Sequence, residues 1–254
     1  MNTKKLAAPL FDLDEVFNVD DYFFAYQDDL TDERSDREVA NLVKLLMLDQ
    51  PMKILDLACG FGRHTNRLAA LGHRVTGIDY MPGFLEIART KAAEMGLEVD
   101  YRQGDMRTVN FQDEFDRVVL LFTSFGYFED SENEDVLRNM VKALKPNGIL
   151  LLDIPNRDAF FKDIPPSSVF EKGNDLLINQ TSFDVITGRM VNHRILIRDG
   201  KRIDKPFSIR FYNATEMCQL LERIGVKDFQ LLGEDHQPIS MKSRRMYVIA
   251  RKKG

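Results

Sequence analysis

The sequence lacks several features that would assign it to a particular class of protein. Its 254 residues contain no Trp, two Cys and four His. Cys59 and Cys218 stand far apart, whereas a secreted chain of this size would more often carry several cysteine pairs. We therefore expect a reducing compartment and a cytoplasmic protein. The scattered His and separated Cys have no metal-ligand spacing, so no metal site is expected.

Long apolar runs and an excess of positive charge are also missing. No stretch reaches the apolar length of a membrane span, and residues 1–11 have no apolar run typical of a signal peptide, so no membrane partner is expected. The formal net charge of −5 argues against a nucleic-acid binder, which needs a basic face for the phosphates. The sequence does not define the oligomeric state, and a homodimer stays open.

An alternation of apolar runs and helical patterns begins after Pro51, continues to residue 154 and resumes at residue 214. The predicted strands are 53–57, 74–78, 98–102, 115–122, 148–154, 226–232 and 246–251, and the predicted helices are 63–71, 82–95, 132–144 and 214–224. Strands that alternate with helices predict βαβ units and a parallel sheet. Residues 12–48 look helical and acidic.

The pattern changes between residues 156 and 212. Apart from a short helical segment at 157–162, this region shows strand-like runs at 176–185, 189–198 and 208–212. Thr187-Gly188 and Asp199-Gly200 are typical of the turns between them. We predict an antiparallel insertion before the last helix.

A glycine pair follows the first predicted strand. Gly60 and Gly62 would let the backbone approach a ligand at the carboxyl end of that strand, where open α/β sheets bind ligands. A dinucleotide-binding fingerprint would have a third Gly at position 65, but Thr65 stands there. A tight turn without a ligand would explain the glycines alone.

A carboxylate follows each of the next two predicted strands. Asp79 could accept hydrogen bonds from ribose hydroxyls, which suits NAD and adenosyl cofactors alike, or it could cap the helix that begins at Pro82. Gly104-Asp105-Met106 could meet an adenine amino group, or form a plain turn.

Aromatic residues follow the fourth predicted strand, in the segment from Phe122 to Phe128. Aromatic faces suit an adenine ring and attract a cation such as a sulfonium. We expect at least one of Phe122, Phe125 and Phe128 to be a core residue instead.

Taken together, these motifs resemble those of class I S-adenosylmethionine-dependent methyltransferases, in family order and spacing over residues 53–154. The matching segments are Ile54–Gly62, Gly77-Ile78-Asp79, Gly104-Asp105-Met106 and Ser124-Phe125-Gly126-Tyr127. The stretch from Tyr22 to Leu46 and the insertion are similar to a bacterial small-molecule subgroup that includes amino-sugar N-methyltransferases. The resemblance implies a Rossmann-like α/β fold with a seven-stranded sheet whose last strand is antiparallel. It also implies an N-terminal helical lid over 1–50, a cofactor-binding core over 51–155 and 213–254, and an insertion over 156–212 that caps the substrate pocket.

The same resemblance implies S-adenosylmethionine as cofactor and names the residues that would bind it. They are Asp56, Ala58, Cys59, Gly60, Gly62, His64, Thr65, Asp79, Tyr80, Met81, Gly104, Asp105, Met106, Phe122 and Ser124. Candidates on the acceptor side are Tyr26, Tyr127, Arg210 and Tyr212. Because Arg210 and Tyr212 are two apart on a predicted strand, they point to one face. That face would roof the acceptor pocket, or it is a solvated sheet face.

The reaction that the resemblance implies is direct displacement of the methyl group by a nitrogen or oxygen of a small-molecule acceptor. Methyl transfer to tRNA or protein is an alternative against which the acidic charge counts. A non-catalytic S-adenosylmethionine-binding protein is another. A nicotinamide oxidoreductase is disfavoured by Thr65 and by the motif at Gly104-Asp105.

Overall fold

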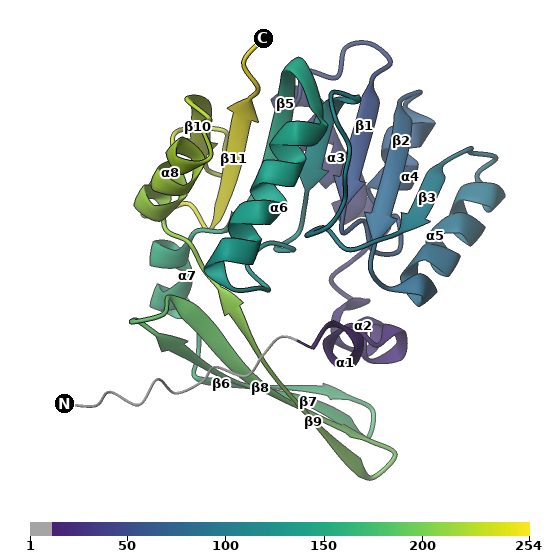
Figure 1. The fold of residues 1–254 in the computed structure, drawn as a ribbon. Helices are drawn as coiled ribbons and strands as arrows, with labels where there is room; N and C mark the ends of the chain where they lie inside the picture. The colour runs from purple at the N-terminus through teal and green to yellow at the C-terminus, as the bar shows by residue number, and fades with distance from the viewer. Residues whose placement is uncertain (1–11) are drawn as a thin grey trace.

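Two β-sheets organise the protein, and the computed structural model describes residues 12–254 (Figure 1). The larger sheet contains β1 (Lys53–Leu57), β2 (Arg74–Asp79), β3 (Asp100–Gln103), β4 (Phe115–Leu120), β5 (Leu144–Pro155), β10 (Asp228–Leu232) and β11 (Arg245–Arg251). Its order is β10-β11-β5-β4-β1-β2-β3. Within these described strands, β11 runs in the opposite direction to the other six. The predicted Rossmann-like, seven-stranded α/β sheet is confirmed.

Helices connect and cover these strands. They are α3 (Asp32–Leu45), α4 (Thr65–Ala70), α5 (Pro82–Glu94), α6 (Asp130–Ala143), α7 (Arg157–Asp163) and α8 (Ala214–Arg223). Alternate residues of β1 pack on opposite faces of the sheet: Leu55 and Leu57 join the apolar cluster of α6 and α8, whereas Ile54 joins that of α3 and α4. Burial on both faces explains the continuous apolar run in this strand.

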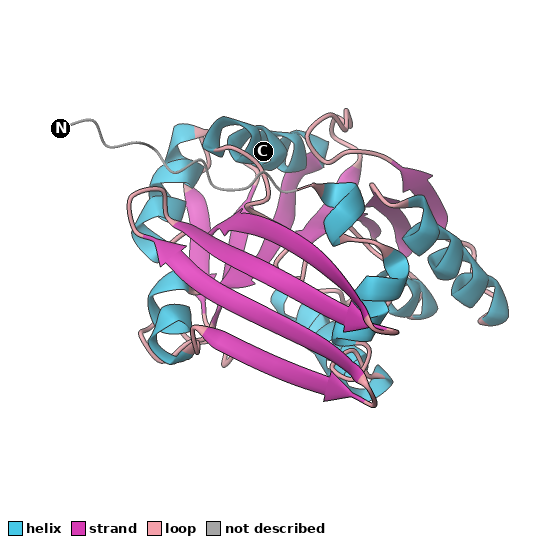
Figure 2. Ribbon diagram, turned by 90° about the horizontal axis from the view of Figure 1, so that it is seen from below, coloured by secondary structure: helices cyan, strands magenta, loops and turns pink. Residues whose placement is uncertain are grey.

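The insertion forms a separate four-stranded antiparallel sheet, seen face-on in Figure 2. Its strands, in sheet order, are β6 (Ser167–Lys172), β7 (Asp175–Asp184), β8 (Arg189–Arg198) and β9 (Lys201–Arg210). The sequence pattern missed β6 and residues 201–207 of β9. Both are polar and largely exposed, so only pairing with a neighbouring strand makes them extended. The carboxyl ends of β1 and β2 face this sheet (Figure 1).

The acidic N-terminal region is three helices rather than one stretch: α1 (Leu13–Val16), α2 (Val19–Tyr26) and α3. Asn18 caps α2 and Thr31 caps α3, each accepting a backbone N–H from three residues on. Asp21 of α2 pairs with Lys205 (2.5 Å) and Arg198 (2.8 Å) of the four-stranded sheet. Helices α1 and α2 therefore lie between the two sheets, whereas α3 packs on the larger sheet. Residues 1–11 of the predicted lid, and the signal-peptide expectation, fall outside the described residues.

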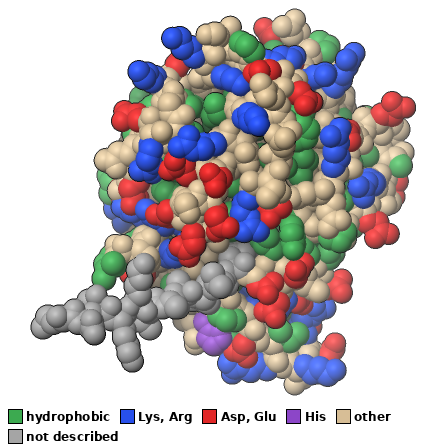
Figure 3. Space-filling view, in the orientation of Figure 1, with side chains coloured by type: hydrophobic (Ala, Val, Ile, Leu, Met, Phe, Trp, Pro, Cys, Tyr) green, Lys and Arg blue, Asp and Glu red, His purple; other side chains and the backbone are tan. Residues whose placement is uncertain are grey.

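The surface charge and the character of the helices bear on the predictions about nucleic-acid and membrane partners. Acidic and basic side chains are interspersed over the face drawn in Figure 3. Over residues 12–254, no helix combines the length and the apolar character that crossing a membrane requires.

Candidate functional site

A cavity lies at the carboxyl ends of β1 to β4, beneath α1 and α2. It encloses about 850 Å³, open mouth included. Thirteen of the fifteen residues predicted to bind the cofactor line it: Asp56, Ala58, Cys59, Gly60, His64, Asp79, Tyr80, Met81, Gly104, Asp105, Met106, Phe122 and Ser124. Gly62 and Thr65 do not. One edge of the sheet thus gathers four motifs that are dispersed along the chain.

The turn after β1 is wound tightly by positive φ angles at Ala58, Gly60 and Gly62. Gly60 has open space where a Cβ would stand, so its backbone is exposed to the cavity. Gly62 lies at the back of the turn, where an added Cβ would overlap the Tyr101 hydroxyl. The small size of Gly62 therefore serves packing between the turn and β3, and its contact with a ligand stays a prediction.

Asp79 holds the cavity floor together. It is 8% exposed, and its two oxygens accept from the backbone N–H of Gly60 (2.7 Å) and of Met81 (2.9 Å). Burial raises the pKa of this carboxyl despite these bonds. The helix-cap alternative is wrong, since Met81 is the N-cap of α5.

Asp56 lies fully buried beneath the glycine turn. It accepts a hydrogen bond from the Thr65 hydroxyl at 2.6 Å, and burial raises its pKa to about 7. Because that hydroxyl is directed at Asp56 and Thr65 is completely buried, Thr65 supports the turn from below and has no surface in the cavity.

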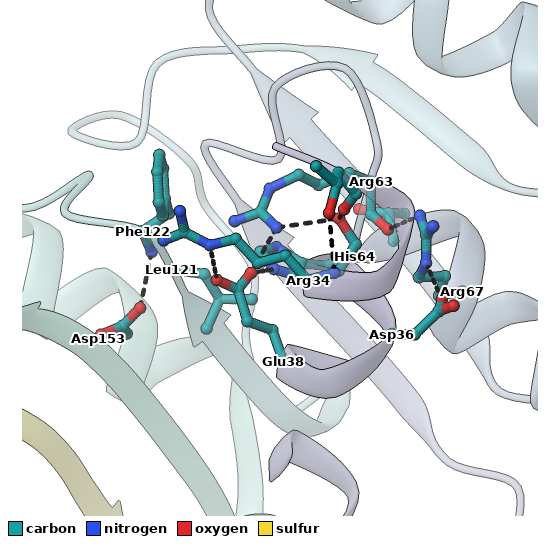
Figure 4. Close-up of polar contacts among 12 residues, drawn as sticks. Arg34, Asp36, Glu38, Arg63, His64, Arg67, Leu121, Phe122 and Asp153 are labelled. Atoms are coloured by element: carbon teal, nitrogen blue, oxygen red, sulfur yellow. Dashed lines mark hydrogen bonds and ion pairs between the residues drawn. The ribbon is translucent and has the colours of Figure 1, made fainter. Parts of the chain in front are cut away.

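Arg63, which was not predicted as a site residue, also lines the cavity, and Glu38 of α3 pairs with it without lining the cavity itself (Figure 4). The Arg63 Nη1 donates to Glu38 of α3 and to the Ser35 hydroxyl. Arg63 Nη2 is buried and has no hydrogen-bond partner among the described residues. The guanidinium stands 4.8 Å from the centre of the Phe122 ring. Arg63 follows the glycine turn directly, but its pairing with Glu38 depends on the position of α3.

Glu38 also joins the imidazole of His64, 2.8 Å away, and Arg34 of its own helix. Burial would raise the pKa of Glu38, but the His64 hydrogen bond and the Arg63 charge hold it well below its usual range. Burial lowers the pKa of His64, which keeps its ring neutral near pH 7. These contacts join the middle of α3 to the residues that directly follow the glycine turn.

The far end of the cavity is formed by the segment after β3. Asp105 accepts from the backbone and side chain of Arg107, with a shortest distance of 2.6 Å. Burial would raise the pKa of Asp105, but the bonds from Arg107 keep it low. The Arg107 guanidinium lies 4.2 Å from the centre of the Phe128 ring. The carboxylate is therefore ionised and oriented, with an aromatic ring close by.

The segment after β4 has strained backbone. Phe122 and Thr123 have φ angles of 55° and 67°, which non-glycine residues rarely adopt. Asp153 stabilises this conformation with two hydrogen bonds. Its carboxylate accepts from the Phe122 backbone N–H (3.1 Å), and its carbonyl accepts from that of Thr123 (3.0 Å). As expected for one of the three rings, Phe125 is a core residue that lines neither this cavity nor the next.

A second cavity, of about 1830 Å³ with its open mouth, adjoins the first. It lies between the N-terminal helices and the four-stranded sheet. The two cavities share five lining residues: Phe17, Tyr22, Phe122, Ser124 and Tyr127. Tyr26 and Tyr127 line the second cavity as predicted, and the Tyr26 hydroxyl accepts from Arg194 Nη2 at 2.8 Å.

The predicted strand at 208–212 ends at Arg210, so Tyr212 lies beyond it, but the two side chains still share a face, with the guanidinium 4.4 Å from the ring centre. The prediction that this face roofs the acceptor pocket is wrong, because neither residue lines either cavity. Phe207, Ile209 and Phe211, which alternate with them, line it instead. The apolar side chains take the inner face because their burial is favourable.

The guanidinium of Arg210 forms ion pairs that connect the end of β9 with α6 and α8. It pairs with Glu216 (2.8 Å) and Asp130 (3.2 Å), and the Tyr212 hydroxyl also contacts Asp130, at 3.3 Å. His193 pairs with Asp204 on the surface, and neither it nor His236 lines the cavities. These contacts explain the placement of Arg210 and Tyr212 without a ligand.

Substitutions at these positions should separate stability from turnover. We expect Arg210→Ala to lower the free energy of unfolding by about 2 kcal/mol, since it removes the ion pairs of a buried guanidinium with Glu216 and Asp130, although Glu216 keeps its pair with Arg157. Tyr212→Phe should leave kcat within about threefold, because the hydroxyl loses only two long hydrogen bonds, to Asn133 and Asp130 at 3.3 Å each, and neither of these residues lines a cavity. Urea unfolding and initial rates measure the two effects. A large fall in kcat for a fully folded Tyr212→Phe enzyme would contradict this placement.

Asp56 should make stability depend on pH. Its pKa in the folded protein, about 7, lies above its ordinary value of 3.8, so its contribution is fully present at low pH and is lost as pH rises from about 4 to about 7. We expect Asp56→Asn to gain stability relative to the native sequence across that interval, by up to about 1.4 kcal/mol per pH unit.

Urea unfolding between pH 4.5 and 7.5 measures this difference. Asp204→Asn is the matched control, because Asp204 is exposed and Arg202 lowers its pKa to about 2, so the difference should be flat above pH 5. A flat difference for Asp56→Asn as well would show that Asp56 is ionised throughout.

Comparison with known proteins agrees with this geometry. Residues 54–148 match the family described as a methyltransferase domain. The chain is 33% identical over 213 residues to a protein of Geobacillus sp. (strain WCH70) named a putative methyltransferase, covering 79% of this chain and 84% of that protein. It is 27% identical over 187 residues to the dTDP-4-amino-2,3,4,6-tetradeoxy-D-glucose N,N-dimethyltransferase of Saccharopolyspora spinosa, covering 72% and 70%.

A solved S-adenosylmethionine-dependent methyltransferase from Clostridium acetobutylicum ATCC 824 has the same fold. It superposes with a TM-score of 0.76 at 18% identity, covering 92% of this chain and 97% of that one. With the ordered motifs, the seven-stranded sheet and the relative matched over 84% of its length, these matches show that the chain belongs to the class I S-adenosylmethionine-dependent methyltransferases.

Proposed function

We propose that this protein transfers the methyl group of S-adenosylmethionine to a nucleophilic nitrogen or oxygen of a small molecule. The observation that carries the proposal is the junction of the two cavities. The first has the motifs of the cofactor site, and the second is enclosed by the N-terminal helices and the four-stranded sheet. An acceptor in the second cavity would meet the cofactor at the residues that both cavities share.

The first cavity fits the cofactor in charge and shape. Arg63 Nη2, buried and unpartnered, suits the carboxylate of the amino-acid portion. Asp79, anchored by two amides, has lone pairs left for ribose hydroxyls, and Asp105 with Met106 is placed for the adenine. When bound, S-adenosylmethionine supplies an electrophilic methyl group on a sulfonium. The aromatic residues at the junction attract such a cation.

The residues of the chain would act by alignment and by exclusion of water. Tyr22 and Tyr127 stand at the junction, and burial raises the pKa of both hydroxyls, so they stay protonated and cannot serve as bases at neutral pH. Well-oriented reactants can gain about 7–11 kcal/mol from alignment alone. The helices over the cavity would keep competing water out.

We infer that nitrogen is the favoured nucleophile. The acids and the imidazole that line the first cavity are occupied: Asp56 with Thr65, Asp79 with two amides, Asp105 with Arg107 and His64 with Glu38. A free amine needs no base to attack, whereas a hydroxyl does. The name of the Saccharopolyspora relative also describes methylation at nitrogen.

A macromolecular acceptor is the alternative in the same enzyme class. It predicts a basic rim, and the charges on the face in Figure 3 are mixed, as the net charge of −5 would suggest. A protein that binds the cofactor without turnover is the alternative outside catalysis. In the first alternative a macromolecule receives the methyl group, and in the second no transfer takes place.

Transfer of a labelled methyl group from S-adenosylmethionine tests the proposal. The purified protein is incubated with separate panels of small amines, phenols and carboxylic acids, and with tRNA. We expect label in at least one small amine, and none with Asp79→Ala. Label in tRNA alone would reject the small-molecule acceptor, and cofactor binding without any transfer would favour the non-catalytic alternative.

A further inference from the structure

Arg194 of β8 is a buried cation in the wall of the second cavity. It is 9% exposed, and its guanidinium lies 5.3 Å from the centre of the Tyr26 ring and 5.2 Å from that of Phe207. Nη2 donates to the Tyr26 hydroxyl at 2.8 Å, and Nε donates to Asn179 Oδ1 at 3.1 Å. Both partners are neutral oxygens. Guanidinium has five N–H donors, so others remain for a ligand.

The other arginines of this sheet each have a carboxylate partner. The pairs are Arg189 with Glu129, Arg198 with Asp21, Arg202 with Asp204, and Arg210 with Glu216. Arg194 forms no ion pair within the part of the chain that the structure describes. A buried charge without a counter-charge is costly, so an anion in this cavity would be strongly stabilised.

Asn192 adds a second unused polar group on the same wall. It lies two residues before Arg194 on β8, so both side chains point to the same face of the sheet. Asn192 is 6% exposed, and its amide donates to the Thr181 hydroxyl at 3.2 Å. Its Oδ1 is buried with no partner among the described residues. A ligand that fills this wall should therefore offer a donor beside an anion.

We propose that the acceptor is an anionic amine, whose carboxylate or phosphate group pairs with Arg194 while a neighbouring hydroxyl or N–H donates to Asn192 Oδ1. The proposal rests on the proposed function and specifies its substrate class. Arg194 and Asn192 line only the second cavity, whereas Ser124 and Tyr127 lie where the two cavities join. The anion therefore anchors one end of the acceptor on the sheet, and the amine extends from it toward the methyl group.

Three probes that share an amino-sugar skeleton test this subsite: D-glucosamine, D-glucosamine 6-phosphate and D-glucosaminic acid. Calorimetric titration uses the full chain saturated with S-adenosylhomocysteine, which fills the first cavity. We expect the phosphate or the carboxylate probe to bind about tenfold or more tightly than D-glucosamine. Whichever of the two is favoured identifies the source of the anion.

The variants Arg194→Met and Arg194→Lys assign the effect to this side chain. Arg194→Met should remove the preference, and Arg194→Lys should keep part of it, since the charge remains. Arg202→Met is the matched control, because Arg202 is an exposed arginine of the same sheet that lines neither cavity, and it should preserve the preference. Binding of S-adenosylhomocysteine and the melting temperature show that each variant is folded.

Equal binding of the three probes by the native sequence, or no binding of any, would overturn the anion subsite. A preference that survives Arg194→Met would overturn it too. Methyl transfer to neutral amines in the broader screen would then leave the proposed function intact. Conversely, an anion preference that depends on Arg194, without transfer to any amine, would reject the proposed function and keep the subsite.

Discussion

Replacing Asp79 by Ala is expected to weaken binding of S-adenosylmethionine by about a hundredfold or more, because the carboxylate makes several charge-assisted hydrogen bonds at once. Its oxygens accept from the amides of Gly60 and Met81, which start the two loops that bound the cavity. The substitution leaves both amides without their partner and removes the proposed acceptor for the ribose. Binding and geometry are lost together.

Calorimetric titration with S-adenosylmethionine measures this loss. Asp100→Ala is the matched control, since Asp100 begins the neighbouring strand β3 but pairs only with the surface around Arg102 and Thr76. Its affinity should match that of the native sequence. An Asp79→Ala protein that keeps its melting temperature and binds as tightly as the control would show that Asp79 is not part of the cofactor site.

Replacing Arg63 by Met is expected to lower the affinity for S-adenosylmethionine by about tenfold to a hundredfold, through loss of the cation that we propose to pair with the cofactor carboxylate. The deficit should be smaller for 5′-methylthioadenosine, which has the nucleoside and sulfur but no amino acid. Comparing the two ligands by titration separates loss of one charge contact from a general collapse of the cavity.

Arg67→Met controls for the second role of Arg63, which is to tie α3 to the glycine turn. Arg67 lies four residues later and also pairs with α3, through Asp32 and Asp36 at 2.6 Å, but it does not line the first cavity. It should bind S-adenosylmethionine normally. If Arg67→Met lost as much affinity as Arg63→Met, docking of α3 rather than charge recognition would explain both.

Local signals in the sequence predicted the elements of the larger sheet closely. The strand predicted at 53–57 coincides with β1, and the helix predicted at 82–95 matches α5 within one residue. Such signals depend only on residues close together in the sequence, so strands and helices can be predicted from them without knowledge of the fold. Strand β6 has no comparable signal, because its partner β7, and not its own residues, makes it a strand.

The sequence by itself determined the order of strands and helices, the seven-stranded sheet and most of the residues that line the cofactor cavity. Those features follow from periodicity and from turns at the ends of buried strands. Only the tertiary structure decided that Glu38 meets Arg63, that Arg210 and Tyr212 face away from the second cavity, and that Arg194 lines it without an ion pair to any described residue. Each of these depends on which face of a strand or helix meets a segment more than 20 residues away, and a period of two shows that residues share a face but not which face is inside.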